Sequence, residues 1–257
     1  MNWLPTNGAL HGVALDHLLA WNLAVIVGLC IAAHVLIVAA FLFRRARKSE
    51  SPVASRTRAN LRPHLLFEFV ILIALTALYL GMDITGHKLW AAIREQPGSA
   101  QPIQVEVTGV QFQWYFRYPG PDAIYGATKP GLVSAPTGNP LGLDPADPHS
   151  ADDIVSAILI LPAGQPVNIT LRSQDVIHGF FVPGMRLKQD AIPGMDGDLQ
   201  FTPTTPGDYV ILCSQVCGLG HSRMQAGLRV VPQAEFEKWL AAREQSILNT
   251  NAARGAQ

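Results

Sequence analysis

The sequence predicts a membrane-anchored all-β protein with two N-terminal transmembrane helices, a β-sandwich and a short C-terminal helix. Only 15% of its 257 residues are charged and its mean hydropathy is +0.20, which indicates more apolar surface than a water-facing domain carries. The apolar residues gather in two long runs, and short β-type segments follow them. The 19 basic and 19 acidic side chains cancel, which excludes a nucleic-acid-binding protein driven by bulk charge.

The first apolar run covers residues 18–43, in which only Asn22 and His34 are strongly polar. A helix needs about 20 residues to cross the hydrocarbon core of a bilayer, so we expect this run to span a membrane. It is longer than the apolar core of a secretory signal peptide. The second run, residues 65–82, is closer to the lower limit of length, and we expect it to form a second span.

Basic side chains crowd between the two runs without a compensating acidic run, at Arg44, Arg45, Arg47, Lys48, Arg56, Arg58 and Arg62. The positive-inside rule therefore places this connection in the cytoplasm. The N-terminus and everything after the second span then lie on the outer side of a cell inner membrane, in an oxidising or periplasmic compartment. We expect residues 1–100 to form a two-helix anchor and residues 101–257 to form the outer domain.

The outer domain shows short β-type segments bounded by Pro, Gly or Asp, at 103–110, 154–161, 167–172, 176–182, 208–213 and 225–231. This spacing favours an antiparallel sandwich. Residues 119–153 are rich in Gly, Pro and Asp and predict a surface insertion. Phe236, Trp239 and Leu240 stand at helical spacing, which predicts a terminal helix over 233–245 packed on the sandwich.

A cluster of soft metal ligands lies in one segment, where Cys213, Cys217, His221 and Met224 follow one another within twelve residues. Thiolates, imidazole and thioether favour copper over magnesium or calcium. A single-copper blue site needs one cysteine, whereas two thiolates can bridge a pair of ions. A disulfide between the two cysteines is the structural alternative, but it leaves the histidine and methionine unexplained. His178 lies in an apolar strand-like segment that a sandwich can bring to the same end as this loop.

Taken together, these features resemble subunit II of the haem-copper cytochrome c oxidases, and the resemblance covers nearly the whole chain. The two spans come first, and within the outer sandwich the family's motifs occur in the family's order: the aromatic stretch 111–118, the Asp-Val-Ile-His segment 175–178, the segment 187–194 and the Cys-x3-Cys-x3-His-x2-Met loop. The resemblance implies a cupredoxin-like Greek-key β-sandwich that carries a binuclear copper centre, called CuA.

The resemblance also implies the ligands of the two copper ions. Cys213 and Cys217 would be bridging thiolates, and His178 and His221 would each complete the coordination of a different copper. Two weak ligands would follow, one for each copper. They are the thioether of Met224, and a backbone carbonyl two residues after the first cysteine.

That carbonyl belongs to Gln215, where many family members carry Glu. In those members the carboxylate reaches a magnesium or manganese ion at the contact with subunit I. A neutral amide is a poorer ligand for a hard dication, so Gln215 puts this second metal site in question. Trp114, taken as the exposed aromatic of the stretch, would be the point of electron entry. A packed aromatic on an edge strand is the alternative for Trp114.

The function implied by the resemblance is that of the electron-entry subunit of a cytochrome c oxidase. Single electrons from cytochrome c would reach the copper pair near Trp114 and leave through the loop of His221 toward haem in subunit I. Oxygen would be reduced to water and protons translocated in that partner chain. The implied partners are subunit I, subunit III, cytochrome c and the membrane, with no nucleic acid.

Two other functions remain as alternatives. A membrane-anchored copper chaperone can also hold copper with a Cys-x3-Cys pair and a histidine, but that histidine lies far downstream, whereas His221 follows Cys217 by four residues. A quinol oxidase subunit II shares the architecture but lacks the copper ligands. The chain contains no Cys-x-x-Cys-His motif for covalently attached haem c, so we expect its electron donor to be a separate protein.

Overall fold

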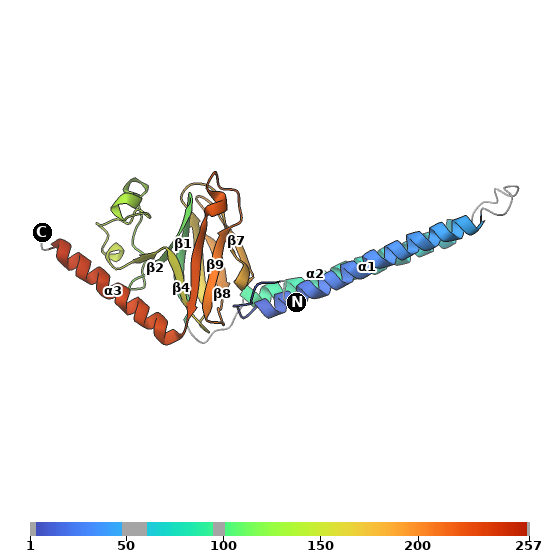
Figure 1. Cartoon of the computed structure of the whole chain (residues 1–257), viewed down its shortest axis with the longest axis horizontal. Helices are drawn as coiled ribbons and strands as arrows, with labels where there is room; N and C mark the ends of the chain where they lie inside the picture. Colours follow the sequence, from blue (N-terminus) through green and yellow to red (C-terminus); the bar gives the residue numbers. More distant parts are fainter. Residues whose placement is uncertain (1–3, 48–60, 95–100, 256–257) are drawn as a thin grey trace. The chain divides into compact units, whose positions relative to one another are not determined.

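The structure of the chain is a computed structural model that describes residues 4–47, 61–94 and 101–255 (Figure 1). The chain divides into two compact units. One unit is Ala14–Ala92, and the other combines Met1–Val13 with Ile93–Gln257. The short N-terminal segment therefore belongs with the C-terminal part of the chain, and each unit is considered by itself below.

The two expected spans are long helices, α1 over Gly12–Arg47 and α2 over Leu61–Arg94. Among the described residues, both are long and apolar enough to cross a membrane, over Gly12–Arg45 and Leu65–Ile93. None of the most apolar window of either helix is buried within the protein. Apolar residues exposed all around a helix suit lipid and not water, so these segments confirm the expected pair of apolar N-terminal helices.

The basic residues that indicated the orientation lie around the ends of these helices. Arg44, Arg45 and Arg47 fall in the last turn of α1, and Arg62 falls in the first turn of α2. Lys48, Arg56 and Arg58 lie outside the described residues.

Within residues 101–255 the strands form two five-stranded sheets. The first has the order β3-β2-β1-β5-β8, with β1 Ile103–Val110, β2 Gln113–Tyr118, β3 Ile154–Ser156, β5 Val167–Ser173 and β8 Gly197–Phe201. The second has the order β4-β10-β9-β6-β7, with β4 Ile158–Pro162, β6 His178–Val182, β7 Leu187–Ala191, β9 Gly207–Cys213 and β10 Gln225–Val231 (Figure 1). This confirms the predicted β-sandwich.

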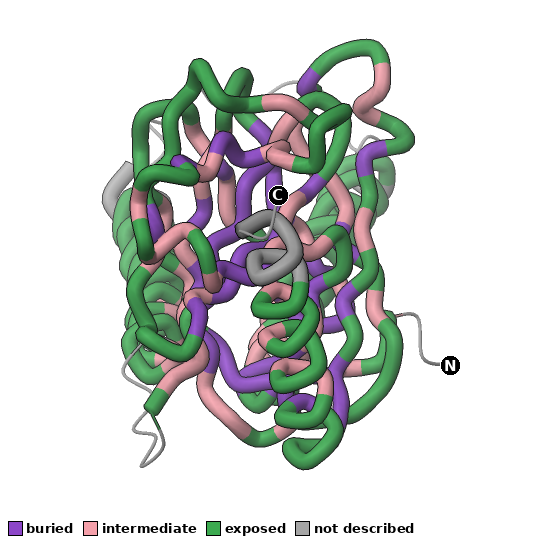
Figure 2. Tube along the Cα trace, turned by 90° about the vertical axis from the view of Figure 1, so that its left-hand side faces the viewer, coloured by how far each residue is buried: buried purple, intermediate pink, exposed green. Residues whose placement is uncertain are grey.

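The core lies between the sheets and follows the two-residue period of the strands. On β5, Val167, Ile169 and Leu171 are buried, and the residues between them are half-buried. Phe180 of β6 and Ile211 of β9 are fully buried from the other sheet. Alternate side chains of a strand point to opposite faces, and the buried segments lie inside the sandwich in Figure 2.

The strand pairing is mixed, so the expectation of a wholly antiparallel sandwich is wrong. Strand β1 runs parallel to β5, with Ile103 opposite Val167, and β10 runs parallel to β4, with Gly227 opposite Ile158. A parallel pair needs a long crossover connection, and the chain provides one by visiting the other sheet between the two partners. The predicted segment 154–161 is split by this change of sheet into β3 and β4.

The terminal helix α3 covers Gln233–Gly255 and is longer than expected. Phe236 is buried, and the Trp239 ring meets the Tyr118 ring edge-on at 5.1 Å between centroids. The Tyr118 hydroxyl donates to the Ile160 carbonyl and accepts from the Ile160 N–H, both at 2.8 Å. One buried aromatic residue thus ties β2 to β4 of the opposite sheet and supports the first turns of α3.

The insertion 119–153 contains short 3₁₀ helices at Pro130–Leu132, Ala135–Thr137 and Pro148–Ala151, and most of its residues are exposed or half-buried. A buried ion cluster fastens it to the sandwich. Arg117 of β2 pairs with Asp153 and, at 3.5 Å, with Glu106 of β1. Burying charges is costly unless they are paired, so the two carboxylates and the guanidinium stay together.

The N-terminal segment packs on the sandwich. The Gly8 N–H donates to the Gly184 carbonyl at 2.8 Å, and the Gly8 carbonyl accepts from the Thr204 N–H at 2.7 Å. Ala9 is 1% exposed and belongs to the sandwich core. A Cβ atom added to Gly8 would lie 2.5 Å from the Tyr209 hydroxyl oxygen, so any larger residue here would have to displace the Tyr209 side chain. The segment before α1 is therefore part of the same compact unit as the sandwich.

Candidate metal centre

The two cysteines of the soft-ligand cluster lie at one end of the sandwich. Cys213 is the last residue of β9, and Cys217 lies in the loop that returns to β10. Their Sγ atoms are 3.8 Å apart and both cysteines are free thiols. A disulfide requires about 2.05 Å between the sulfurs, so the structural alternative is not formed here.

Each cysteine faces its own histidine. The Nδ1 atom of His178 lies 3.9 Å from Cys213 Sγ, and the Nδ1 atom of His221 lies 3.7 Å from Cys217 Sγ. The potential ligand atoms of His178 and the two cysteines all lie within 4.8 Å of one another. His178 of β6, Cys213 of β9 and Cys217 of the loop therefore converge on one small volume, and His221 lies beside the Cys217 sulfur.

The two expected weak ligands each lie beside a different sulfur. Met224 Sδ is 3.7 Å from Cys217 Sγ, and the Gln215 carbonyl oxygen is 3.2 Å from Cys213 Sγ. All six residues that the sequence proposes as copper ligands are thus brought together. One thiol has a histidine and a carbonyl beside it, and the other has a histidine and a thioether.

The backbone of the loop is fixed at several points. The Cys213 N–H donates to the Met224 carbonyl at 3.1 Å, and the Ser214 N–H donates to the Gly179 carbonyl at 2.9 Å. A Cβ atom on Gly179 would lie 3.0 Å from the Gln215 backbone nitrogen, so the loop passes close to β6 at this glycine. Gly218 has a φ of 135°, a conformation that side-chain-bearing residues rarely adopt. These restraints place the cysteines before any ion binds.

Asp175 orients the His178 ring, a role that the sequence analysis missed. His178 is fully buried, and its Nε2 atom lies 2.8 Å from Asp175 Oδ1. Burial raises the pKa of Asp175, but hydrogen bonds from His178 and from the Gln111 and Val176 N–H groups outweigh burial and bring that pKa below its usual value. A carboxylate on Nε2 holds the proton there and leaves Nδ1 free to bind a metal. The Asp-x-x-His spacing was the available signal.

The thiol of Cys217 is held in its neutral form. Burial raises its pKa, and the neighbouring Cys213 sulfur raises it further. Cys217 and Met224 are only 4% and 2% exposed, so water is largely kept from this side of the cluster. Because a thiolate is the form that binds metal, a soft cation must displace the proton from this thiol.

The expectation that Trp114 is an exposed aromatic is wrong, because its side chain is 0% exposed. Its ring meets the His178 ring at 5.8 Å and the Phe180 ring at 5.5 Å, both edge-on. Every second residue of a strand points to the same face, and on β2 the inward-facing residues are Trp114, Phe116 and Tyr118, which explains the error. Strand β2 also lies between β1 and β3, so Trp114 is not on an edge strand either.

Phe112 is the exposed aromatic of this stretch, and the sequence analysis did not single it out. It lies in the turn between β1 and β2 and is 38% exposed. A Cβ atom on Gly220 would lie 2.4 Å from the Phe112 ring, so this ring rests on the backbone of the loop that carries the cysteines. Val216 and Leu219 of the same loop are almost fully exposed. This end of the sandwich therefore presents an apolar surface directly outside the cluster.

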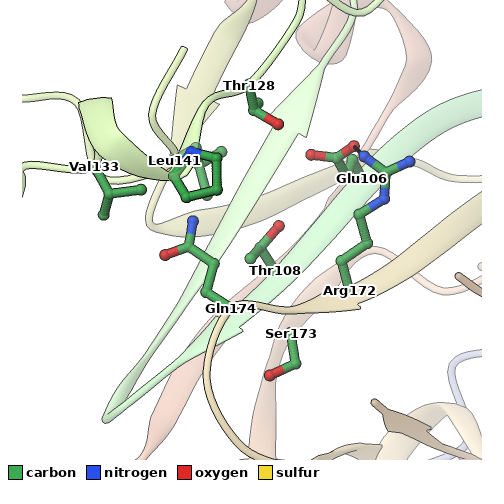
Figure 3. A pocket seen from close by; sticks show the side chains of 9 residues that line it. Glu106, Thr108, Thr128, Val133, Leu141, Arg172, Ser173 and Gln174 are labelled. Atoms are coloured by element: carbon green, nitrogen blue, oxygen red, sulfur yellow. Dashed lines mark hydrogen bonds and ion pairs between the residues drawn. The ribbon is translucent and has the colours of Figure 1, made fainter. Parts of the chain in front are cut away.

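A separate cavity of about 470 Å³ lies where the insertion covers the outer face of β1 and β5 (Figure 3). Thr108 and Gln174 point into it, and Leu141 and Val133 form part of the wall from the insertion. Its lining carries hydroxyl, amide and carboxylate groups, which are hard or neutral ligands, together with the guanidinium of Arg172, and it contains no sulfur or imidazole among the described residues.

A family model, cytochrome c oxidase subunit II, periplasmic domain, matches residues 103–231, from the first residue of β1 to the last of β10. The chain belongs to the cytochrome c oxidase subunit II family. The soft cluster is thus consistent with the copper site of this family, and the sandwich is the family's periplasmic domain.

Other members of the subunit II family are similar over different lengths. The alternative cytochrome c oxidase subunit 2 of Bradyrhizobium diazoefficiens is 38% identical over 157 residues, 60% of this chain and 55% of that protein, so the match spans about half of that relative. The probable cytochrome c oxidase subunit 2 of Streptomyces coelicolor is 27% identical over 246 residues, 86% of this chain and 72% of that protein. The cytochrome c oxidase subunit 2 of Synechocystis is 33% identical over 141 residues, 55% of this chain and 33% of that protein.

A solved structure has also been matched. It is the crystal structure of the periplasmic domain of subunit II of cytochrome oxidase of Bradyrhizobium japonicum. The match includes 58% of this chain and 99% of that one, with 24% sequence identity and a TM-score of 0.42.

Proposed function

We propose that this chain is the electron-entry subunit of a haem-copper cytochrome c oxidase. It accepts single electrons from cytochrome c at a binuclear copper centre and passes them to haem in subunit I, where oxygen is reduced and protons are translocated. The observation that carries the proposal is the pairing of two free thiols, 3.8 Å apart, each with its own histidine.

The chemistry of the ligand set fits two copper ions. Cys213 and Cys217 would bridge them, and His178 and His221 would bind one copper each. The backbone carbonyl of Gln215 and the thioether of Met224 would be the weak ligands. Soft sulfur ligands with imidazoles select copper over hard dications. When bound, the copper pair would supply a one-electron store shared between two metals. The residues around it supply the rigid frame, because buried strands and fixed loop carbonyls limit how far the ligands can move.

The apolar end of the sandwich is the proposed docking surface for the donor. Phe112, Val216 and Leu219 are exposed there, beside the loop of the cysteines. Phe112, and not Trp114, is therefore the proposed point of electron entry. Trp114 lies behind the surface against the His178 ring, where it packs the centre from inside.

The proposed topology places the N-terminus and the sandwich on the periplasmic side of the cell inner membrane. The backbone pairing of Gly8 with Gly184 and Thr204 supports a common side for both. The two helices would then return through a cytoplasmic connection that begins at Arg44 and Arg45. Within the membrane they would contact subunit I and subunit III of the oxidase.

The alternative functions find less support. A copper chaperone must release its ion, whereas His178 is fully buried and comes from a strand separate from the cysteine loop. A quinol oxidase subunit II lacks the copper ligands, and here all six candidate residues converge.

The deciding experiment loads the full chain in detergent with copper and measures metal content and the electron paramagnetic resonance spectrum. We expect two coppers per chain and a mixed-valence signal with one unpaired electron shared equally between them. The Cys217→Ser variant should lose this signal. Cys30→Ser is the matched control, since Cys30 lies in α1, outside the sandwich, and should change nothing. One copper per chain with a blue-site spectrum would refute the binuclear centre.

A further inference from the structure

The Gln215 side chain points away from the cysteines toward β7. Its Nε2 atom donates to Asp190 Oδ2 at 2.7 Å, while its own carbonyl oxygen lies 3.2 Å from Cys213 Sγ. One residue therefore links the candidate copper centre to a carboxylate on the edge strand of the second sheet. An ionised carboxylate only accepts hydrogen bonds, so the amide must present its nitrogen, and not its oxygen, to Asp190.

Strands β6 and β7 also restrain Gln215. Asp190 of β7 stands directly opposite Gly179 of β6, and Gly179 gives the loop the space to pass. A Cβ atom on Gly179 would lie 3.0 Å from the Gln215 nitrogen and 3.1 Å from its Cγ. The Ser214 N–H also donates to the Gly179 carbonyl. Both the backbone before Gln215 and its side chain are thus anchored to the β6-β7 pair.

The hard dication implied by the family resemblance does not fit these groups. Magnesium and manganese prefer oxygen ligands, whereas Asp190 Oδ2 already accepts from the amide nitrogen. Asp190 Oδ1 is buried and accepts no hydrogen bond from the described residues, and the Lys188 ammonium lies 3.6 Å from it, at ion-pair distance. A dication here would meet an amide donor and an ammonium group.

We propose that the hydrogen bond between Gln215 and Asp190, and not a hard dication, fixes the Gln215 carbonyl beside Cys213. The inference rests on the proposed copper centre. Asp190 and the Gln215 side chain are positioning residues in this account, because they act on the centre through the loop backbone. The centre should then assemble and keep its properties without magnesium or manganese.

The first test compares Asp190→Ala with Asp190→Asn in the copper-loaded full chain. Alanine removes the acceptor, whereas asparagine retains an oxygen that can accept from the Gln215 amide. We expect the alanine variant to release copper to a chelator about tenfold faster or more, the lower end of the effect of losing an outer-sphere partner, and to shift its copper spectrum and reduction potential. The asparagine variant should stay close to the parent protein. Asp198→Asn, at an exposed position of β8, is the matched control.

The second test titrates manganese into the assembled oxidase, because the family's dication site lies at the contact with subunit I, and follows its electron paramagnetic resonance signal. The parent chain should bind no manganese at this position. Gln215→Glu puts two carboxylates face to face, and like charges at that distance require a proton or a cation between them. This variant should therefore gain one manganese site per chain, which Asp190→Ala should remove again. The second test keeps the inference falsifiable even where Asp190→Ala fails to fold.

The outcomes separate the two proposals. A parent chain without a mixed-valence copper pair would overturn the proposed function. A parent chain that holds the pair, but in which Asp190→Ala leaves copper release, spectrum and potential unchanged, would overturn only the positioning role. The role would also fall if the parent chain bound one manganese that Asp190→Ala or, where that variant does not fold, Asp190→Asn abolished.

Discussion

The Nε2 atom of His178 lies 2.8 Å from Asp175 Oδ1, so a carboxylate holds the imidazole with its Nδ1 turned to the cysteines. Replacing Asp175 by Ala removes this restraint and the charge that favours a proton on Nε2. We expect copper affinity to fall about 10- to 100-fold, as measured by competition with a chelator. Asp198→Asn should have no effect on affinity. An unchanged affinity in Asp175→Ala would show that the ring is held by packing alone.

Phe112 and Trp114 should respond differently to truncation. Phe112→Ala should leave copper content intact but weaken the docking of reduced cytochrome c by about 1–2 kcal/mol, roughly tenfold, because an exposed aromatic anchor is lost. Stopped-flow electron transfer over a range of donor concentrations measures this effect. Normal transfer rates in Phe112→Ala would remove it from the entry surface.

Trp114→Ala should act mainly on stability. The indole is fully buried against His178 and Phe180, so its removal leaves a large cavity and should lower the free energy of unfolding by about 3–5 kcal/mol. Thermal unfolding of the full chain checks this value. A stable Trp114→Ala variant with full copper content and slow electron transfer would instead restore Trp114 as the entry residue.

The N-terminal segment should contribute measurably to the stability of the sandwich. Ala9→Leu adds bulk to a position that is 1% exposed, and overpacking of this kind costs about 1–3 kcal/mol. We expect the midpoint of thermal unfolding of the sandwich to fall by several degrees, at about 2–4 °C per kcal/mol. Ala135→Leu, at an exposed position of the insertion, is the control. Equal midpoints for the two variants would mean that the segment is not docked.

The pH response of the insertion follows from His149 and Asp122, whose Nδ1 and Oδ2 atoms are 2.5 Å apart. The hydrogen bond raises the pKa of His149 and lowers the pKa of Asp122. The histidine contribution is fully present below its unfolded pKa and is lost as pH rises through its folded pKa. The aspartate contribution is present above its unfolded pKa and is lost as pH falls through its folded pKa.

The pair should therefore stabilise the insertion most between about pH 4 and 6.5. Nuclear magnetic resonance of labelled histidine should show a titration of His149 above its usual midpoint. Asp122→Asn should move that midpoint down. Identical midpoints with and without the Asp122 carboxylate would contradict the pairing.

The sequence alone predicted the candidate metal cluster because five of its six candidate ligands lie between residues 213 and 224, where their spacing along the chain indicates soft-metal chemistry. His178 was more difficult, since a position 35 residues before Cys213 enters the site only through the β6-β9 pairing that places Phe180 opposite Cys213. The two long helices were predictable because a continuous apolar run of this length is typical of a helix that crosses a membrane.

Other features could not be read from residue order. The aromatic stretch does not show which of Phe112 and Trp114 faces the core, because a shift of one residue reverses the faces of a strand. The parallel partners β1 and β5 are separated by the whole insertion, and spacing alone does not identify them. Arg117 meets Asp153 across that same insertion, and neither residue carries a local signal for the other.

The pairing of Gly8 with Gly184 and Thr204 has a practical consequence for anyone who trims this protein to a soluble fragment. A fragment that starts at residue 101 would lack this segment, so the part of the sandwich core that Ala9 covers would be exposed to solvent. A synthetic peptide with the sequence of residues 4–11 should bind to this exposed part of the fragment and restore the missing contacts as a separate chain.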